Sequence, residues 1–308
     1  MKPCLTAIIF AVVAQAAWSA EQVQTIVDDA WQGAQGSHFS GRITEAHPAA
    51  RPNDGPLASL YRNTRVLMAG GEEGLVTWSV DGKEWTLRST EHGYWELAES
   101  GSIDLKPGWH EITSVPMASS PAGLLVVDPR NSIGIISDID DTILVTDVSD
   151  TGTMLKNSLI VSPEHREAVP GMAELYRKLM QKNPAPESTP IIYLSASPRQ
   201  LTDNIRRFLV VDRFPRGILQ LRATSAEGGD EEKDHEAYKL HHIETILAAF
   251  PQLKFYFFGD DVERDPETYA KVAERHSAQV AGVWIHRINR DPKRTIYPGQ
   301  ADVRELIP

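Results

Sequence analysis

Acidic side chains gather in the middle of the chain, directly after a short apolar run. The run covers residues 133–136, and it is followed by Asp138, Asp140, Asp141 and Thr142. Two carboxylates two positions apart on a loop can hold one hard cation together. Asp138 can also attack phosphorus, since an acyl-phosphate formed on a carboxylate hydrolyses readily. The spacing therefore predicts phosphoryl-transfer chemistry, with a plain acid-rich turn as the alternative.

Three later stretches offer side chains suited to the same chemistry. An apolar run over residues 190–194 ends at Ser195 and Ser197, and Lys239 lies inside a helical pattern. A further run over residues 253–258 is followed by Asp260 and Asp261, with Asp265 beyond. Hydroxyl, lysine and paired carboxylate groups can stabilise a transferring phosphoryl group and hold its cation. Chance is a poor explanation for all four stretches in one chain.

The first acid group supplies the predicted reacting residues. Asp138 is the predicted nucleophile, and Asp140 would protonate the leaving oxygen and later activate water. Thr142 would orient Asp140 or close the turn, in contact with the substrate. Because carboxylate and phosphate repel each other, the chemistry calls for a Mg²⁺ ion between them. Its predicted ligands are Asp138, the backbone carbonyl of Asp140, and Asp260.

The remaining catalytic side chains are predicted from their positions. Ser195, directly after its strand, would hold a phosphoryl oxygen, and Lys239 would neutralise phosphoryl charge. Ser197 is a second candidate for substrate contact, with a helix N-cap before Pro198 as the structural alternative. For Lys239 the alternatives are a solvated helix lysine and replacement by Lys233.

Two further acids are predicted to assist these catalytic residues without reacting themselves. Asp261 and Asp265 would support the metal or orient Lys239. Asp265 also precedes Pro266, a pattern typical of a helix N-cap.

The elements that position these groups alternate between strands and helices from residue 133 onward, which is typical of βαβ units. Further strands are predicted at 217–221 and 279–285, and helices from 170, over 198–210 and 238–250, and from 265. The connection over residues 143–168 is either a cap or a plain excursion. Since parallel sheets bind ligands at the carboxyl ends of their strands, the site residues should meet at those ends. The predicted fold class is α/β, a parallel sheet with helices on both faces.

A small β-rich domain is predicted before this sheet. Residues 77–80 and 83–87 flank Asp81-Gly82, a strong hairpin signal. Strands are also predicted at 65–69, 93–98, 108–113 and 123–127, whose spacing favours a small antiparallel sandwich. Residues 21–31 show weak helical periodicity, and 34–58 are predicted to be loop. Core packing is the favoured role of four aromatic residues, Trp78, Trp85, Trp95 and Trp109, with an aromatic ligand groove as the alternative.

The length, the net charge and the first residues of the chain limit its possible functions. The chain has 308 residues and a formal net charge of −11, which suggests two domains and argues against nucleic acid as the main partner. Residues 1–20 have Lys2, a short apolar run and small residues near Ala16, the pattern of a bacterial signal peptide. The predicted domains are therefore 1–20 signal peptide, 21–130 β-rich and 131–308 phosphatase. The predicted location is the periplasm or outside the cell.

Several motifs resemble one known family. They are Ser137-Asp138-Ile139-Asp140-Asp141-Thr142, Tyr193-Leu194-Ser195-Ala196-Ser197-Pro198, and Phe258-Gly259-Asp260-Asp261 through to Asp265-Pro266. Over about residues 130–290 the chain resembles the catalytic domain of the actin-patch-protein type of phosphatidate phosphatase, a relative of the lipins within the haloacid dehalogenase superfamily. The resemblance implies a haloacid-dehalogenase-like sheet and a Mg²⁺-dependent enzyme that releases phosphate from phosphatidate. The chain departs from the family pattern at Ala223-Thr224-Ser225 and at Val262-Glu263.

The leading hypothesis is a phosphatase of phosphatidate or a related phospholipid, with possible peripheral contact to a membrane. The alternatives are a phosphatase of a soluble ester and a non-catalytic phospholipid-binding module. Six arginines follow the Ser195 stretch: Arg199, Arg206, Arg207, Arg213, Arg216 and Arg222. They could offset the negative net charge near an anionic membrane, or form a solvated helix face. Arg216 is the one predicted to contact the substrate.

Overall fold

The computed structural model describes residues 23–46, 56–146, 166–223, 234–289 and 291–307. Two of the sequence predictions fall outside these ranges. They are the signal peptide at residues 1–20 and Lys233 as the alternative to Lys239. Most of the connection over residues 143–168 also lies outside them. Within the described residues, no helix is both long and apolar enough to cross a lipid bilayer.

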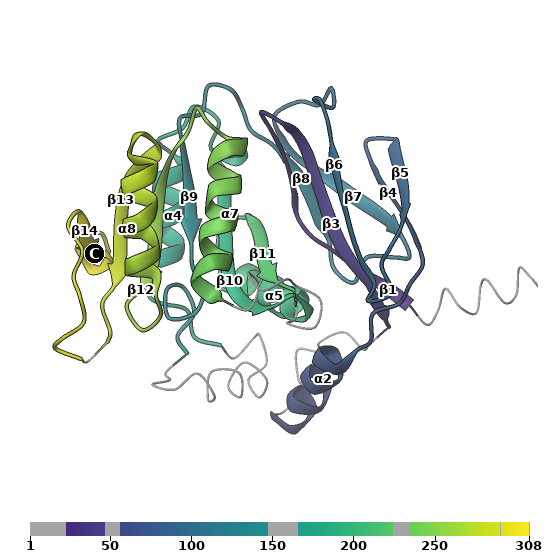
Figure 1. Cartoon of the computed structure of the whole chain (residues 1–308), viewed down its shortest axis with the longest axis horizontal. Coiled ribbons are helices and arrows are strands. Elements are labelled where there is room, and N and C mark those ends of the chain that lie inside the picture. Colours follow the sequence, from purple (N-terminus) through teal and green to yellow (C-terminus); the bar gives the residue numbers. More distant parts are fainter. Residues whose placement is uncertain (1–22, 47–55, 147–165, 224–233, 290, 308) are drawn as a thin grey trace, which may run out of the picture.

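The N-terminal part forms one sheet of eight strands (Figure 1). The strands are β1 (Val23–Val27), β2 (Ala30–Gly33), β3 (Gly36–Glu45), β4 (Leu75–Val80), β5 (Lys83–Arg88), β6 (Tyr94–Glu99), β7 (Gly108–Val115) and β8 (Ala122–Val126). Their order is β1-β3-β2-β8-β7-β4-β5, and β6 pairs with β3. All pairs are antiparallel except β2 with β8. Helix α2 (Pro56–Met68) lies between β3 and β4.

This sheet curls around an aromatic core. Trp78 of β4 stacks on Trp95 of β6 with ring centroids 4.8 Å apart, although these strands are far apart along the hydrogen-bonded order. Trp78 and Trp95 are buried, and Trp85 packs against the same cluster. The core role predicted for these tryptophans is confirmed. Trp109 lies elsewhere, partly buried against the core of the second sheet.

Some of the predictions for the N-terminal part are confirmed and others are wrong. The hairpin is confirmed: Asp81 and Gly82 both have positive φ, 46° and 82°, as a type I′ turn requires. The helical pattern over 21–31 is wrong for the described residues 23–31, because Asp28 and Asp29 separate two short strands there. The loop over 34–58 is wrong for residues 36–45, since β3 buries Ser and Gly positions whose composition hides its alternation, and for residues 56–58, which begin α2. The strand at 65–69 is wrong because these residues end helix α2.

The second sheet has six parallel strands, all hydrogen-bonded in the order β11-β10-β9-β12-β13-β14. Its strands are β9 (Ile133–Ser137), β10 (Ile191–Pro198), β11 (Ile218–Arg222), β12 (Lys254–Asp260), β13 (Val280–His286) and β14 (Gln300–Asp302). The α-helices of this part that lie in described residues are α4 (Met172–Met180), α5 (Thr202–Val211), α7 (His235–Ala249) and α8 (Asp265–Arg275). The predicted strand and helix alternation is confirmed, and only the short edge strand β14 was not foreseen.

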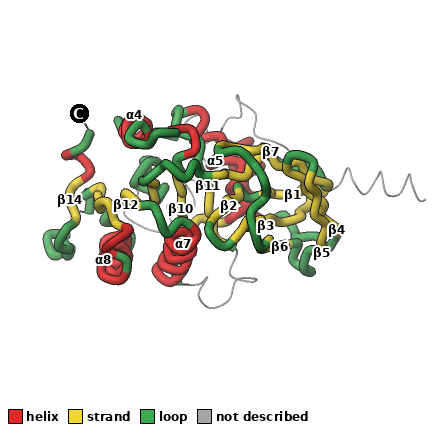
Figure 2. Tube along the Cα trace, turned by 90° about the horizontal axis from the view of Figure 1, so that it is seen from above, coloured by secondary structure: helices red, strands yellow, loops and turns green. Residues whose placement is uncertain are grey.

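Helices cover both faces of this sheet (Figure 2). Ile136 and Phe257 point to the face packed by α7 and α8, while their neighbours Ile135 and Phe258 point to the face packed by α4 and α5. Successive side chains of a strand alternate between faces, so strands buried on both sides must be apolar throughout. This is why the runs that end at the site residues contain almost no polar residue.

The two sheets touch near the end of α7. The backbone N–H of Ala34 donates to the carbonyl of Ala249 at 2.8 Å, and Trp31 and Leu125 belong to the same apolar cluster as α7. Gly33 is required at this contact, because a Cβ there would lie 2.7 Å from the Ala249 oxygen.

Candidate active site

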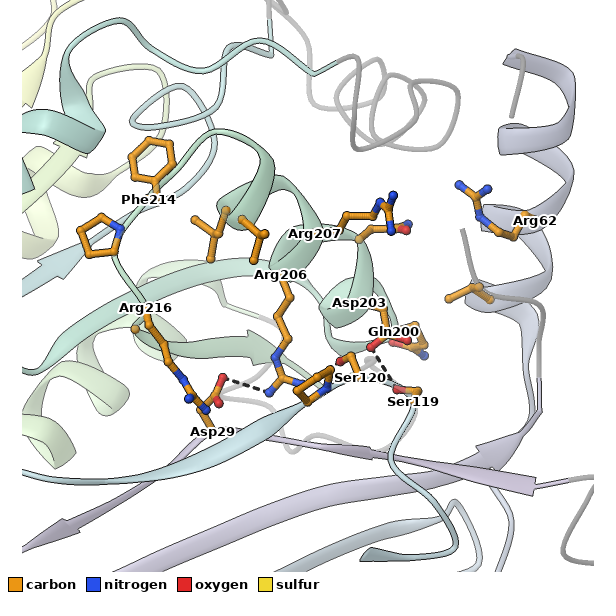
Figure 3. Close-up of a pocket in the computed structure, with 17 residues that line it drawn as sticks. Asp29, Arg62, Ser119, Ser120, Gln200, Asp203, Arg206, Arg207, Phe214 and Arg216 are labelled. Carbon is orange, nitrogen blue, oxygen red and sulfur yellow. Dashed lines mark hydrogen bonds and ion pairs between the residues drawn. The ribbon is translucent and has the colours of Figure 1, made fainter. Parts of the chain in front are cut away.

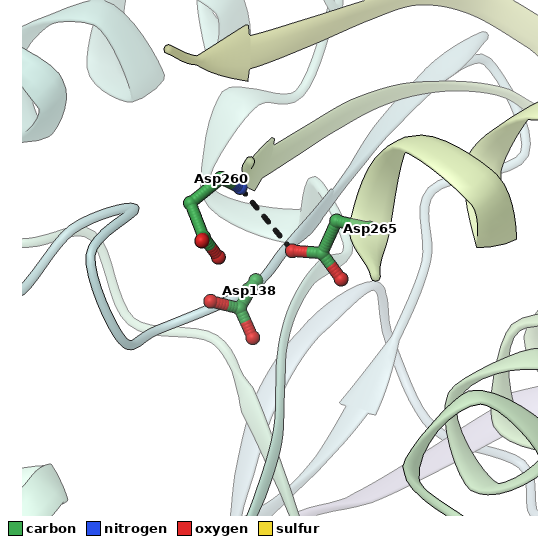
Figure 4. Close-up of side chains that lie close together, drawn as sticks. All are labelled: Asp138, Asp260 and Asp265. Carbon is green, nitrogen blue, oxygen red and sulfur yellow. Dashed lines mark hydrogen bonds between the residues drawn. The ribbon is translucent and has the colours of Figure 1, made fainter. Parts of the chain in front are cut away.

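Three aspartates meet at the carboxyl ends of the central strands. Asp138 directly follows β9, Asp260 ends the neighbouring strand β12, and Asp265 begins α8. One carboxylate oxygen of each lies within 4.8 Å of the others (Figure 4). All three side chains are buried. Parallel pairing of β9 with β12 brings together acids that are more than a hundred residues apart in the chain, as the sequence predicted.

Lys239 reaches this group from the first turns of α7. Its Nζ donates to Asp138 Oδ1 at 2.8 Å, to Asp265 Oδ1 at 2.6 Å and to Glu263 Oε2 at 3.1 Å. The side chain is only 3% exposed. The alternative of a solvated helix lysine is therefore excluded, and the ammonium lies against the predicted nucleophile.

Glu263 is a site residue that the sequence analysis did not assign. The loop after β12 turns back because Asp260 Oδ1 accepts the backbone N–H groups of Val262 and Glu263, at 2.7 and 3.0 Å. This turn aims the Glu263 carboxylate at Lys239. The sequence did contain an indication that Glu263 is unusual, since Val262-Glu263 is one of the places where the chain departs from the family pattern.

The electrostatics of the group favour a bound cation. Burial, with repulsion among the neighbouring acids, raises the pKa of Asp138 and of Asp260 well above the ordinary value. Burial alone would lower the pKa of Lys239, but the three carboxylates that it contacts outweigh this and raise it. When ionised, four carboxylates face one ammonium here, an excess of three negative charges.

Two carboxylate oxygens are positioned to accept such a cation. Asp138 Oδ2 and Asp260 Oδ2 are buried and, among the described residues, accept no hydrogen bond. Leaving a buried carboxylate oxygen without a partner is costly. Carboxylate oxygens are the ligands that Mg²⁺ and Ca²⁺ prefer. The donor set therefore fits a hard divalent cation at the predicted ligands Asp138 and Asp260.

Asp140 is held by the two predicted serines. Its Oδ2 accepts from Ser195 Oγ at 3.1 Å and from Ser197 Oγ at 3.2 Å. Burial, with repulsion from Glu263, raises the pKa of Asp140 to about 6 against the opposing effect of the hydroxyl donors. A carboxyl with that pKa can both give and take a proton near neutral pH. Ser197 does not cap a helix, because the following helical turn has no side-chain cap.

The loop after β9 returns on itself to present these groups. Asp141 adopts a positive φ of 54°, a conformation that aspartate tolerates better than most residues, and its N–H donates to the carbonyl of Leu144 at 2.7 Å. The Thr142 N–H closes the turn on Ile139 at 3.3 Å. Its Oγ1 is buried and has no partner within the described residues, so the hydroxyl is available to a substrate oxygen.

The two supporting acids have different partners. Asp265 holds Lys239 with one oxygen and accepts the Asp260 N–H at 3.3 Å with the other. It is the first residue of α8, which begins after Arg264 without a side-chain cap, so the N-cap alternative is wrong. Asp261 instead accepts the N–H groups of residues 288 and 289, both at 2.7 Å, and so anchors the segment after β13.

The structure does not bring Arg216 to the acid group. Arg216 precedes β11, at the amino end of the parallel strands, whereas the acids follow the carboxyl ends. Its guanidinium lies over the ring of Trp109, 4.2 Å from the centroid. The prediction that Arg216 contacts the substrate at the acid group is therefore wrong. Because the strands are parallel, Arg216 lies at their amino ends, whereas the acid group lies at their carboxyl ends.

Comparison with known proteins agrees with this geometry. The model of one family, described as the catalytic domain of phosphatidate phosphatase APP1, matches residues 133–287, half of the chain. The chain belongs to this family. The matched segment runs from the start of β9 to just beyond β13, so it contains the acid group, Ser195 and Lys239. The family resemblance seen in the sequence motifs is confirmed.

Two curated relatives match parts of the chain. Phosphatidate phosphatase APP1 of Saccharomyces cerevisiae is 26% identical over 203 residues, which cover 64% of this chain and 34% of the yeast protein. An uncharacterized protein of Schizosaccharomyces pombe is 25% identical over 163 residues, which cover 53% of this chain and 26% of that protein. The chain thus spans about a quarter to a third of the length of these relatives.

Solved structures are only distantly similar. The Pnkp1/Rnl/Hen1 complex matches with 13% identity and a TM-score of 0.34, over 59% of this chain and 53% of that chain. The class C acid phosphatase from Bacillus anthracis matches with 17% identity and a TM-score of 0.31, over 48% of this chain and 62% of that chain. Scores this low carry no argument about function.

Proposed function

We propose that the chain is a Mg²⁺-dependent phosphatidate phosphatase, which hydrolyses its phosphomonoester through an aspartyl-phosphate on Asp138. The observation that carries the proposal is the buried group in which Lys239 donates to Asp138 Oδ1 while Asp138 Oδ2 has no partner among the described residues. A carboxylate that the protein holds in place by one oxygen without engaging both is suited to act as a covalent nucleophile.

In the first step, the Asp138 carboxylate attacks phosphorus and the bond from phosphorus to the ester oxygen breaks. Asp140 gives its proton to that oxygen, so diacylglycerol leaves as an alcohol. In the second step, Asp140 takes a proton from water, and the resulting oxygen attacks phosphorus. Phosphate leaves and the Asp138 carboxylate is restored. The two serines that hold Asp140 position it for both transfers.

Charge is the main obstacle to the first step, because a carboxylate must approach a phosphate. Lys239 lies against Asp138 and would meet the phosphoryl oxygens, and Thr142 Oγ1 is available to one of them. Mg²⁺ would be held by Asp138, Asp260 and the backbone carbonyl of Asp140, and would supply the positive charge that the acid group lacks. Both oxygens of Asp265 are engaged by the protein, so its proposed role is to position Lys239.

The order of the parallel strands, with Asp138 after the central strand β9, supports the proposal that the fold is haloacid-dehalogenase-like. A soluble phosphate ester is the second candidate substrate, since Glu263 adds a further carboxylate to the site at a position where the chain departs from the family pattern. A non-catalytic lipid-binding module is disfavoured, because such a module would not need Asp138, Asp140 and Lys239 in one hydrogen-bonded arrangement.

The proposal is tested by a phosphate-release screen of the purified chain, with and without Mg²⁺. The substrates are phosphatidate vesicles, lysophosphatidate and soluble phosphate esters. Phosphatidate should be hydrolysed fastest, and chelator should abolish the release. Preference for a soluble ester would favour the second candidate. No release from any substrate would contradict the proposal.

We also propose that the chain is exported to the periplasm, which rests on the pattern of residues 1–20 alone.

A further inference from the structure

The strand that carries the two site serines is held by its sheet along only part of its length. The pairing of β10 with β9 ends at Tyr193. The pairing of β10 with β11 is irregular between Ser195 and Pro198. Ser197 therefore lies where the regular ladder has been interrupted, although its hydroxyl donates to Asp140. Where a ladder is interrupted, contacts from outside the sheet must hold the side chains in place.

The chain that follows these serines is paired with the N-terminal sheet at two points. Asp28 and Asp29, the two residues between β1 and β2, are both buried. Asp28 Oδ2 lies 3.4 Å from Arg199 Nη2. Asp29 Oδ2 accepts a hydrogen bond from Arg206 Nη2 at 2.9 Å, in the wall of a cavity of about 500 Å³ beside α5 (Figure 3). Adjacent acids of one sheet thus reach two arginines of the other part.

Both acids are fixed within the N-terminal sheet. Asp28 Oδ2 also accepts from Ser40 Oγ at 2.6 Å, and the Asp28 N–H donates to the carbonyl of Ser40 at 3.0 Å. Asp29 Oδ1 accepts the backbone N–H of Gly123 at 3.0 Å. The two paired arginines have side chains that are each 12% exposed. The two pairs are therefore alike in charge, burial and support, and they differ in their distance from Ser197.

Arg199 is close enough to Ser197 along the chain to fix its position. Pro198 alone separates these two residues, whereas Arg206 lies further on, inside α5. Proline fixes its own φ, here −59°, and restricts the residue before it, so few dihedral angles can absorb a movement of Arg199. The carbonyl of Arg199 also accepts from Thr202 Oγ1 at 2.7 Å, in the helical turn that begins there. A displacement of Arg199 is therefore passed to the Ser197 hydroxyl.

The N-terminal sheet also contacts Arg199 through an aromatic ring. The guanidinium carbon of Arg199 lies 5.3 Å from the ring centroid of Tyr94, which belongs to β6. The same ring lies 5.0 Å from the guanidinium carbon of Arg42 on β3. A cation over an aromatic face is attracted to it. Arg199 is thus bound both by an acid and by a ring of the N-terminal sheet.

We propose that Asp28 is a positioning residue for the phosphatase reaction, and that it acts through Arg199 on Ser197 and Asp140. The N-terminal sheet is then part of the catalytic unit, because it fixes the loop that aims Asp140 at the ester oxygen. Without the pair, Asp140 keeps its carboxyl group but loses its alignment for giving a proton to that oxygen. The effect on rate rests on the proposed function, whereas the position of the loop does not.

Hydrogen exchange of the whole chain, read by mass spectrometry, tests the position of the loop without a substrate. Asp28→Asn is compared with its matched control Asp29→Asn, since each removes one buried charge and keeps the size of the side chain. The Ser197 amide donates to Ser195 Oγ at 2.9 Å. Asp28→Asn should speed exchange of this segment about tenfold or more, and Asp29→Asn by less than about threefold. Strand β12 should exchange alike in both variants, as a reference for overall stability.

Reaction rates test the consequence for catalysis. Phenyl phosphate and p-nitrophenyl phosphate have the same shape near phosphorus, but the first needs a proton on its leaving oxygen far more than the second. The ratio kcat/KM includes only the steps up to departure of the leaving group, so the later action of Asp140 on water does not enter. Asp28→Asn should lower kcat/KM about tenfold or more for phenyl phosphate, and less than about threefold for p-nitrophenyl phosphate. Asp29→Asn should change both values by the same factor.

Two further variants check the route from Asp28 to Asp140. Arg199→Met removes the other partner of the pair, and it should repeat both results even if Asp28→Asn fails to fold. In a Ser197→Ala chain, adding Asp28→Asn should cost far less rate on phenyl phosphate than it does in the parent, because both changes disturb one contact. Urea denaturation should show which variants fold.

Three results would overturn the proposal. They are exchange in Asp28→Asn and Arg199→Met that equals exchange in Asp29→Asn, equal loss of rate on the two esters, and equal cost of Asp28→Asn with and without Ser197. A chain that hydrolyses no ester would contradict the proposed function alone. The exchange measurement would then still decide whether Asp28 holds the loop.

Discussion

Replacing Lys239 by methionine tests the electrostatic account of the site. The ammonium makes three contacts of 2.6–3.1 Å with carboxylates and is 3% exposed, so its removal leaves buried charge without compensation. Loss of one partner from a buried ion pair costs about 3–5 kcal/mol. We therefore expect Lys239→Met to lower the free energy of unfolding by about that amount at neutral pH, measured by urea denaturation in chelator.

Lys271→Met is the matched control. Lys271 also pairs with a glutamate, Glu236, but its own side chain is 47% exposed and Arg264 pairs with the same glutamate, so we expect its removal to cost less than about 1 kcal/mol. Mg²⁺ should recover part of the loss in Lys239→Met, because it supplies positive charge to the same carboxylates and binds only the folded chain. If Lys239→Met costs no more than Lys271→Met, Lys239 is not the charge that compensates this group.

Asp260→Ala should raise the Mg²⁺ concentration needed for half-maximal phosphate release, because an open carboxylate oxygen is lost; an unchanged requirement would argue against Asp260 as a ligand. Burial lowers the pKa of His242 from 6.5 to about 3, so the unfolded chain takes up the proton first and stability falls as pH drops from 6.5 toward 3. His242→Gln should flatten that part of the stability curve, and an unchanged curve would refute the assignment. Intact mass of the exported protein should show cleavage between Ala16 and Glu21, whereas a retained Met1 would refute export.

The acid group was predictable because parallel strands restrict where their ends can lie. Once the runs before Asp138 and Asp260 are recognised as buried parallel strands, their carboxyl ends must share one edge. The contact of Lys239 with Asp138 depended in addition on α7 crossing that edge, which the motif order indicated. The same reasoning on strand direction would have excluded Arg216 from the acid group, since a residue that precedes a parallel strand lies at the amino ends of the strands.

Other features depend on geometry that the pattern does not contain. Glu263 reaches Lys239 only because Asp260 turns the loop back through two backbone N–H groups. Strand β3 buries serine and glycine beside Phe39 and Ile43, so its alternation is weak in apolar content. The cavity beside α5 exists only because two sheets distant in sequence pack together, and no local pattern in either sheet predicts it.

The most direct test of the central claim is the rate of phosphate release by Asp138→Asn. Asparagine keeps the size of the side chain but cannot form the acyl-phosphate. The variant should fold, as near-ultraviolet circular dichroism and urea denaturation would show, and its turnover of phosphatidate should fall by about a thousandfold or more. A folded Asp138→Asn protein that retains substantial turnover would contradict the covalent mechanism.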